Sequence, residues 1–359
     1  MSAALAFAHD TLGQRVLFGA GAAASNLSAE VQRLGSKRVM LIATPGQAEL
    51  ASAITSRADI ALSFDDVVQH VPVEKAEQAR EAASAANIDL IVAVGGGSTT
   101  GLAKAIALTT GIPIVAVPTT YSGSEATNVW GLTEASRKST GVDDRVLPVT
   151  VIYDAELTMS LPVDLSVASG LNAIAHCVDS MWAPRADPIN AALAAEGIRA
   201  LASGLRLIAA DRLDARGREE AQYGAYLSAV AFASAGSGLH HKICHVLGGA
   251  YDLPHAQTHA VVLPYVAAFN CGFAPEAAAR IAAAFGSSTA LDGLESLRRD
   301  LSAPRALRDY GFDEASIAEA AELILPAVPA SNPRPVTAND LERLVRAAWA
   351  GSPAAELEE

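Results

Sequence analysis

The chain is poor in cysteine, in aromatic side chains and in positive charge. Its 359 residues include 3 cysteines and 5% aromatic residues, and 26 lysines and arginines face 39 aspartates and glutamates, for a formal net charge of −13. No basic cluster is present, so neither nucleic acid nor an anionic membrane surface is an expected partner. No apolar run approaches the roughly 18 residues that cross a membrane, and the first residues do not resemble an export signal.

The number and spacing of the cysteines indicate a reducing cellular compartment. Cys177, Cys244 and Cys271 form no CxxC pair and are odd in number, so we expect reduced thiols in a cytoplasmic protein. Cys177 and Cys244 lie next to His176 and His245 in the sequence. Neighbouring helical residues point about 100° apart, so we expect these thiols to pack in the core rather than to act as nucleophiles.

Hydrophobic residues make up 51% of the chain, enough for a large core. Short β-branched apolar runs at residues 38–43, 88–94, 112–117 and 149–153 alternate with Ala-rich amphipathic segments, a pattern typical of a parallel sheet with helical crossovers. From about residue 161, long segments such as 188–209 and 216–235 indicate helices only. We predict a Rossmann-like α/β dinucleotide-binding domain over 1–160 and an all-α domain over 161–359.

A glycine-rich loop follows the predicted strand 88–94 and precedes a predicted helix. Glycines let the backbone approach a ligand, and the amides of a helix N-terminus suit a pyrophosphate. The loop fits neither GxGxxG nor GxxxxGK[ST], so a purely structural turn is the alternative. A second polar loop, 118–125, follows the next strand, and two such loops form a dinucleotide cradle. The expected cofactor residues are Gly95, Gly96, Gly97, Ser98, Thr119, Thr120 and Ser124.

The first predicted strand is followed by Ala43, Thr44 and Pro45, with no acidic residue to hold a ribose 2′-hydroxyl or to repel a 2′-phosphate. We therefore expect the cofactor to be NADH or NADPH, with weak discrimination between them.

Histidines are concentrated in one segment: five of the eight lie within residues 239–264. His241 and His245 are four residues apart on a predicted helix, as are Asn172 and His176 on another, and His255 follows a Gly-Gly break. Gathered imidazoles act as ligands or general acids. Isolated histidines such as His9 and His70 are more often structural, and the same reading is the alternative for the cluster.

Six motifs occur in order along almost the whole chain: GGGS-x-x-x-x-AK, PTT with GSE, SGLNAIAH, HxxxHxxGG, PHxxxxAxxLP, and NPRP at 332–335. Together they resemble the iron-containing alcohol dehydrogenase family. The resemblance implies a dehydroquinate synthase-like fold, an N-terminal dinucleotide-binding domain, a helical C-terminal domain and a divalent metal held by one Asp and three His. It also places Lys138 near the cofactor.

Carried over by motif, the metal histidines would be His176, His241 and His255, with His245 as a nearby active-site residue. Asn172 stands at the Asp position. A neutral amide supplies no charge and is a poor ligand for a borderline cation, so we expect no metal, although three imidazoles can hold zinc.

Other departures point to one branch of the family. Gly101 replaces an Asp, PTTYSGSE is one residue shorter than PTTAGTGSE, and PHAQTHA replaces PHGxxNA. Each is similar to the maleylacetate reductase branch. That resemblance implies a homodimer that reduces the carbon-carbon double bond of maleylacetate, a small dicarboxylate, to 3-oxoadipate in aromatic-compound catabolism.

Hydride addition to the alkene carbon remote from the ketone would leave an enolate. We expect His241 or His245 to supply the proton, with His176, His255 and Asn172 nearby and Lys242 or Arg334 as candidate carboxylate partners. Three alternatives stay open: a metal-dependent alcohol or aldehyde dehydrogenase, a lyase of the dehydroquinate synthase type, and a cofactor-binding protein without activity.

Overall fold

The computed structural model describes residues 5–69, 71–134 and 137–357, with the side chains of residues 137 and 138 outside the description. The chain forms two compact units. The α/β unit comprises Leu12–Pro162 and Arg212–Gln222, and the helical unit comprises Met1–Thr11, Val163–Asp211 and Tyr223–Glu359. Helix α7 (Ala215–Ala235) therefore begins in the first unit and ends in the second.

The α/β unit is built on a six-stranded sheet with the order β1-β8-β5-β4-β2-β3, and all its pairings are parallel. The predicted α/β class and its four buried strands are confirmed. Strands β2, β4, β5 and β8 coincide with the predicted runs, whereas β1 and β3 form the two edges. The strands are β1 (Arg15–Phe18), β2 (Val39–Ile42), β3 (Ile60–Phe64), β4 (Leu90–Gly95), β5 (Ile114–Pro118) and β8 (Thr150–Tyr153).

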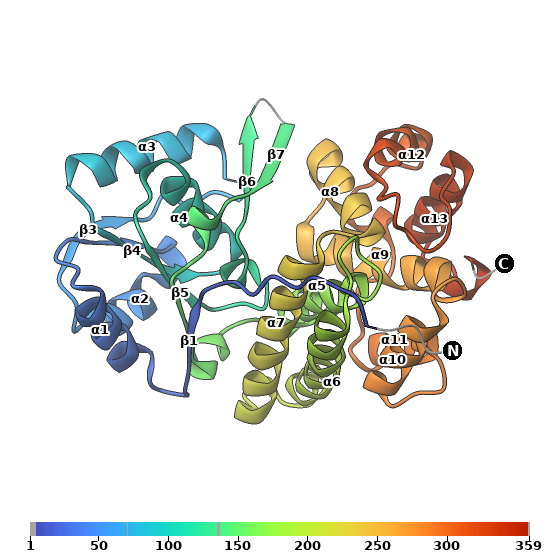
Figure 1. Cartoon of the computed structure of the whole chain (residues 1–359), viewed down its shortest axis with the longest axis horizontal. Coiled ribbons are helices and arrows are strands. Elements are labelled where there is room, and N and C mark those ends of the chain that lie inside the picture. Colours follow the sequence, from blue (N-terminus) through green and yellow to red (C-terminus); the bar gives the residue numbers. More distant parts are fainter. Residues whose placement is uncertain (1–4, 70, 135–136, 358–359) are drawn as a thin grey trace. The chain divides into compact units, whose positions relative to one another are not determined.

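Helices cover both faces of this sheet (Figure 1). Helices α1 (Ala23–Leu34) and α2 (Ala48–Thr55) pack on one face through Leu27 and Ile54, and α3 (Val73–Ala85) and α4 (Gly97–Thr110) pack on the other through Ala79 and Ile106. This double cover explains why every residue of β4 and β5 is buried. A separate antiparallel hairpin consists of β6 (Val129–Glu134) and β7 (Arg137–Val142).

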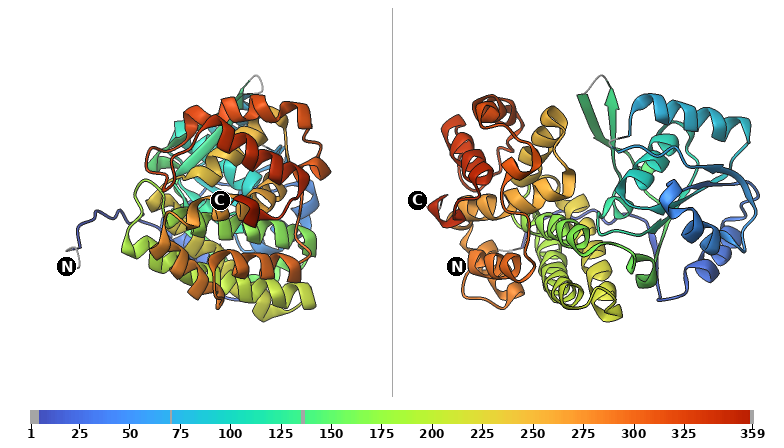
Figure 2. Two further views of the ribbon diagram at one scale, coloured as in Figure 1. Left: turned by 90° about the vertical axis from the view of Figure 1, so that its right-hand side faces the viewer. Right: turned by 180° about the vertical axis from the view of Figure 1, so that it is seen from behind.

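The helical unit contains no strand among its described residues (Figure 2). One core cluster joins α8, α9, α12 and α13, with Leu247, Val262, Ile317 and Leu344 fully buried. Besides the end of α7, the helices of the helical unit are α5 (Val163–Ser180), α6 (Pro188–Ala210), α8 (Leu239–Tyr251), α9 (His255–Cys271), α10 (Pro275–Phe285), α11 (Ala290–Asp300), α12 (Ile317–Ile324) and α13 (Ala338–Ala350).

The Gly-Gly pair does not break a helix, contrary to the prediction. Helix α8 runs through Gly248 and Gly249 and ends at Tyr251, and its C-cap Asp252 takes a left-handed φ of 52° before Pro254. Within the described ranges, no helix is both long and apolar enough to cross a membrane.

Candidate active site

The loop between β4 and α4 has no room for side chains. Gly95 has a φ of 154°, and a Cβ there would lie 2.4 Å from Thr99 Oγ1. A Cβ on Gly96, the N-cap of α4, would lie 3.0 Å from Thr120 Cγ2. The two predicted cofactor loops therefore lie against each other, and their glycines are required by this close approach.

The second loop leaves two hydroxyls for a ligand. Thr119 donates its amide to the Gly95 carbonyl at 3.0 Å, and its Oγ1 accepts from Gln47 Nε2 at 3.1 Å. Thr120 Oγ1 and Ser122 Oγ are buried and have no hydrogen-bond partner among the described atoms. A buried hydroxyl without a partner is costly, and the N-terminus of α4 lies beside these groups. This arrangement suits the oxygens of a pyrophosphate.

Of the three remaining predicted cofactor residues, the side chains of two are described. Ser98 lies in the first turn of α4, and Ser124 begins a short 3-10 helix, Ser124–Ala126. Lys138 lies on β7, and its side chain is outside the described part of the chain.

A buried lysine holds the segment that follows the second loop. Lys104 Nζ donates to the carbonyls of Thr127 at 2.8 Å and Val129 at 2.7 Å, and burial lowers its pKa to about 7. Glu125 Oε1 accepts a hydrogen bond from Tyr153 at 2.8 Å, and burial raises the pKa of this carboxyl. Lys104 is the last residue of the GGGS-x-x-x-x-AK motif, so the motif contributes both the glycine-rich loop and a residue that holds the segment after the second loop.

In the helical unit, α5, α8 and α9 bring six imidazoles together. The rings of His176 and His241 stack with centroids 4.8 Å apart, and Phe232 lies 4.3 Å from the His241 ring. The His241 and His245 rings are 6.0 Å apart. The other members of the cluster are His240, His255 and His259.

Four of these rings are kept neutral by burial. Burial lowers the pKa of His176 to about 4 and that of His240 to about 3. It lowers the pKa of His241 and His259 well below the ordinary value, with the surrounding histidines adding to the effect. His245 and His255 are only half-buried. Asn172, one turn before His176, is buried, and its Oδ1 has no partner among the described residues.

Sequence reasoning missed an inner group of three residues. His240 Nε2 and His259 Nδ1 are 2.9 Å apart, and Cys244 Sγ lies 3.7 Å from His240 Nε2. Burial and Asp179 hold the pKa of the Cys244 thiol well above its usual range, so this thiol is not a free nucleophile. The signal was present in the sequence: His240 and Cys244, like His255 and His259, are four residues apart on one helix.

A second missed residue is Asp179, fully buried at the end of α5. Its Oδ2 lies 2.8 Å from His241 Nδ1. Asp179 is three residues after His176 and therefore on the same side of the helix, which the sequence could have shown.

The proposed carboxylate partners have other contacts. The Arg334 guanidinium lies over the rings of Phe269 and Phe273, at 4.3 and 5.2 Å from their centroids, and donates to the Leu357 carbonyl. Lys242 is half-buried on α8.

Outside the cluster, His9 Nδ1 lies 2.9 Å from Asp187 Oδ2. His70 lies outside the described residues.

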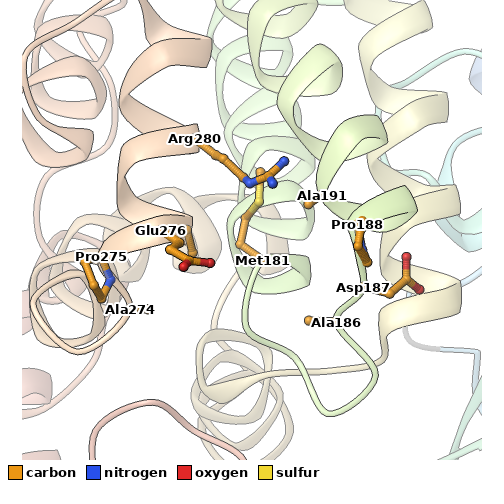
Figure 3. Close-up of a pocket in the computed structure, with 10 residues that line it drawn as sticks. Met181, Ala186, Asp187, Pro188, Ala191, Ala274, Pro275, Glu276 and Arg280 are labelled. Atoms are coloured by element: carbon orange, nitrogen blue, oxygen red, sulfur yellow. The ribbon is translucent and has the colours of Figure 1, made fainter. Parts of the chain in front are cut away.

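A pocket of about 510 Å³ lies elsewhere in the helical unit (Figure 3). None of the predicted site residues lines it. None of its lining residues carries a buried polar atom without a partner among the described residues. Its lining residues are Met181, Ala186, Asp187, Pro188, Ala191, Ala274, Pro275, Glu276, Ala277 and Arg280.

Comparison with known families accounts for both halves of the chain. Residues 13–155 match the family described as "Iron-containing alcohol dehydrogenase", and residues 166–349 match "Fe-containing alcohol dehydrogenase family, C-terminal". The chain belongs to the iron-containing alcohol dehydrogenase family.

Individual relatives match this chain over nearly its whole length. A maleylacetate reductase of Pseudomonas sp. (strain P51) is 45% identical over 97% of this chain and 99% of its own. An iron-containing alcohol dehydrogenase of Corynebacterium glutamicum has a crystal structure that is 63% identical, covers 99% of this chain and 100% of that chain, and has a TM-score of 0.97. The maleylacetate reductase of Agrobacterium tumefaciens is 41% identical over 97% of this chain and 99% of its own, with a TM-score of 0.92.

The expectation that no metal is bound is wrong. The chain belongs to an iron-containing family, and the ligand atoms of His240, Cys244 and His259 all lie within 4.8 Å of one another. The prediction relied on Asn172 at the family's Asp position and overlooked this inner group. Two imidazole nitrogens and a thiolate sulfur fit a borderline cation such as Fe²⁺ or Zn²⁺, and ion binding would replace the hydrogen bond between the two rings.

Proposed function

We propose that this protein reduces the carbon-carbon double bond of maleylacetate with NADH or NADPH and forms 3-oxoadipate. The observation that carries the proposal is the match to maleylacetate reductases over essentially the full length of both chains, 45% identical for the relative from Pseudomonas sp.. The shortened loop at 118–125 and Gly101 in the glycine loop support it, because both are similar to that branch of the family.

The chemistry requires a hydride, a proton and a group that stabilises negative charge. Hydride from the nicotinamide adds to the alkene carbon remote from the ketone, and the alkene electron pair moves to give an enolate. A proton then adds to the neighbouring carbon and restores the ketone. One molecule of NAD(P)H and one proton are consumed for each 3-oxoadipate formed.

The residues of the α/β unit are suited to hold the hydride donor. The amides at the start of α4 and the buried hydroxyls of Thr120 and Ser122 are available for the pyrophosphate. No carboxylate follows β2 at residues 43–47 to exclude a 2′-phosphate, which supports use of both cofactors.

The residues of the helical unit are suited to supply the proton and to stabilise the enolate. His241 and His245 are the candidate acids, and the ring of His176 and the amide of Asn172 are the neighbouring polar groups. A divalent ion held by His240, Cys244 and His259 would supply positive charge to this cluster.

A spectrophotometric assay tests the proposal. NADH oxidation is followed with maleylacetate and, in parallel, with simple aldehydes, and the product is identified by mass spectrometry. We expect rapid oxidation with maleylacetate and stoichiometric 3-oxoadipate. The 63% identical structure is described as an alcohol dehydrogenase, so turnover of aldehydes with none of maleylacetate would replace our proposal with that activity.

Two narrower proposals concern the oligomeric state, which the resemblance implies, and the cellular location. We propose that the protein is a homodimer, which light scattering tests. We also propose a cytoplasmic location, which its three cysteines, none of them in a disulfide, support. Cell fractionation tests the location.

A further inference from the structure

Asp179 lies between two parts of the histidine cluster. It occupies the last turn of α5, three residues after His176, and its carboxylate reaches the N-terminus of α8. Its Oδ2 accepts hydrogen bonds from the amides of Gly238 at 2.9 Å and His241 at 3.3 Å, and lies 2.8 Å from His241 Nδ1. The carboxylate therefore caps α8 and contacts the His241 ring with the same oxygen.

These contacts determine where the His241 hydrogen lies. Two backbone N–H groups already point at Oδ2, so this oxygen is an acceptor. A proton on Asp179 would occupy Oδ1, which has no hydrogen-bond partner among the described residues. Whether Asp179 is ionised or protonated, Nδ1 of His241 must donate to Oδ2. The neutral imidazole then carries a lone pair on Nε2.

We propose that Asp179 is a positioning residue that fixes His241 in the Nδ1–H tautomer and aims the Nε2 lone pair into the cluster. His241 Nε2 is buried and has no partner among the described atoms, as expected of an acceptor or ligand that awaits its contact. The proposal rests on the proposed function in one respect: it removes His241 as the proton donor and leaves His245, which is half-buried, to supply the proton.

The backbone opposite Asp179 is shaped to keep this geometry. A Cβ on Gly238 would lie 2.3 Å from Asp179 Oδ1, so the carboxylate occupies the space that any side chain at position 238 would need. Gly238→Ala should therefore displace a chemically intact carboxylate, whereas Asp179→Leu removes the acceptor oxygens and keeps a side chain of similar length.

The first test is a ¹⁵N NMR spectrum of protein labelled in the histidine rings, with His241→Gln identifying the His241 signals. We expect protonated Nδ1 and unprotonated Nε2 in the wild-type protein. In Asp179→Leu no acceptor faces Nδ1, so Nε2–H should become populated. We expect Asp179→Leu to lose about 10- to 100-fold in kcat with maleylacetate, while KM for NADH is unchanged. Gly238→Ala should share the kinetic loss.

Asp187→Leu is the matched control. Asp187 caps α6 through the amides of Ile189 and Asn190 and lies 2.9 Å from His9 Nδ1, so it repeats the cap and the histidine contact outside the cluster. It should lose stability and keep kcat. Nε2–H in wild-type His241, or kcat loss no greater in Asp179→Leu than in Asp187→Leu, would overturn the proposal. If the wild-type protein does not reduce maleylacetate, the proposed function fails, and the wild-type tautomer still decides the role of Asp179.

Discussion

The histidines of the cluster differ in what their ring nitrogens contact. His241 uses Nδ1 for Asp179, and His240 and His259 share one hydrogen bond between them. His245 and His255 are half-buried and can exchange protons with solvent more readily than the four buried rings. The eight histidines of the chain therefore do not share one chemical role, because their ring nitrogens have different contacts.

At His245, replacement by alanine should lower kcat with maleylacetate by roughly 10²- to 10⁴-fold, because a general acid is removed. NADH affinity, measured by fluorescence titration, should hardly change. His9→Ala is the control, since His9 contacts Asp187 outside the cluster. An unchanged kcat in folded His245→Ala protein would remove this residue from the chemistry.

The inner metal group makes a spectroscopic prediction. Protein loaded with Co²⁺ should show a thiolate-to-cobalt charge-transfer band, because Cys244 Sγ lies with two imidazole nitrogens in one group of possible ligands. Cys244→Ser should abolish the band. Cys177→Ser is the matched control, since Cys177 is also a buried thiol but lies on α5 outside this group. Binding of Co²⁺ without the band would place the ion at ligands other than Cys244.

At the scale of elements, burial on both faces decided which strands could be predicted. The residues of β2, β4, β5 and β8 are all buried and form uniform apolar runs. The edge strands β1 and β3 mix half-buried with exposed positions, so their runs do not stand out. Helix α8 passes through two glycines because packing of Leu247 in the core outweighs their low helix propensity.

The histidine cluster was predictable only where its residues share a helix. The spacing of His241 and His245, and of Asn172 and His176, is visible in the sequence. The contacts of Asp179 with His241 and of His240 with His259 join different helices, and they depend on how α5, α8 and α9 pack. No local pattern encodes that packing.

Gly97 tests the loop between β4 and α4. In Gly97→Val, the side chain would enter the space beside Ser122, whose Oγ lies 3.3 Å from the position of a Cβ. We expect both NADH and NADPH to bind at least about 10-fold more weakly, because backbone approach to the pyrophosphate is blocked. Calorimetry measures both affinities. Gly272→Val is the control, since a Cβ there meets nothing within 4 Å and the residue ends α9. Equal affinities in the two variants would show that the cofactor binds elsewhere.

For the whole molecule, the buried ionisable groups set how stability depends on pH. His176 and His240 have folded-state pKa values of about 4 and 3, below the value of 6.5 expected in the unfolded chain, and His241 and His259 shift in the same direction. Asp179 shifts the opposite way, to about 6, so its contribution is lost as pH rises from about 4 to 6. Four histidines act against two buried carboxyl groups, those of Asp179 and Glu125, whose pKa values are both raised.

The unfolding free energy should therefore fall as pH decreases from about 6.5 towards 4. In that window the unfolded chain binds protons that the buried histidines reject, so unfolding takes up on the order of two or more protons. Urea unfolding in chelator at pH 7.5, 6 and 5 measures this as a decreasing midpoint. His240→Gln removes one of the four groups and should make the decrease less steep by about one proton, whatever its stability at pH 7.5. A midpoint that stays constant or rises at pH 5 would show that the cluster is already protonated or open to solvent in the folded state.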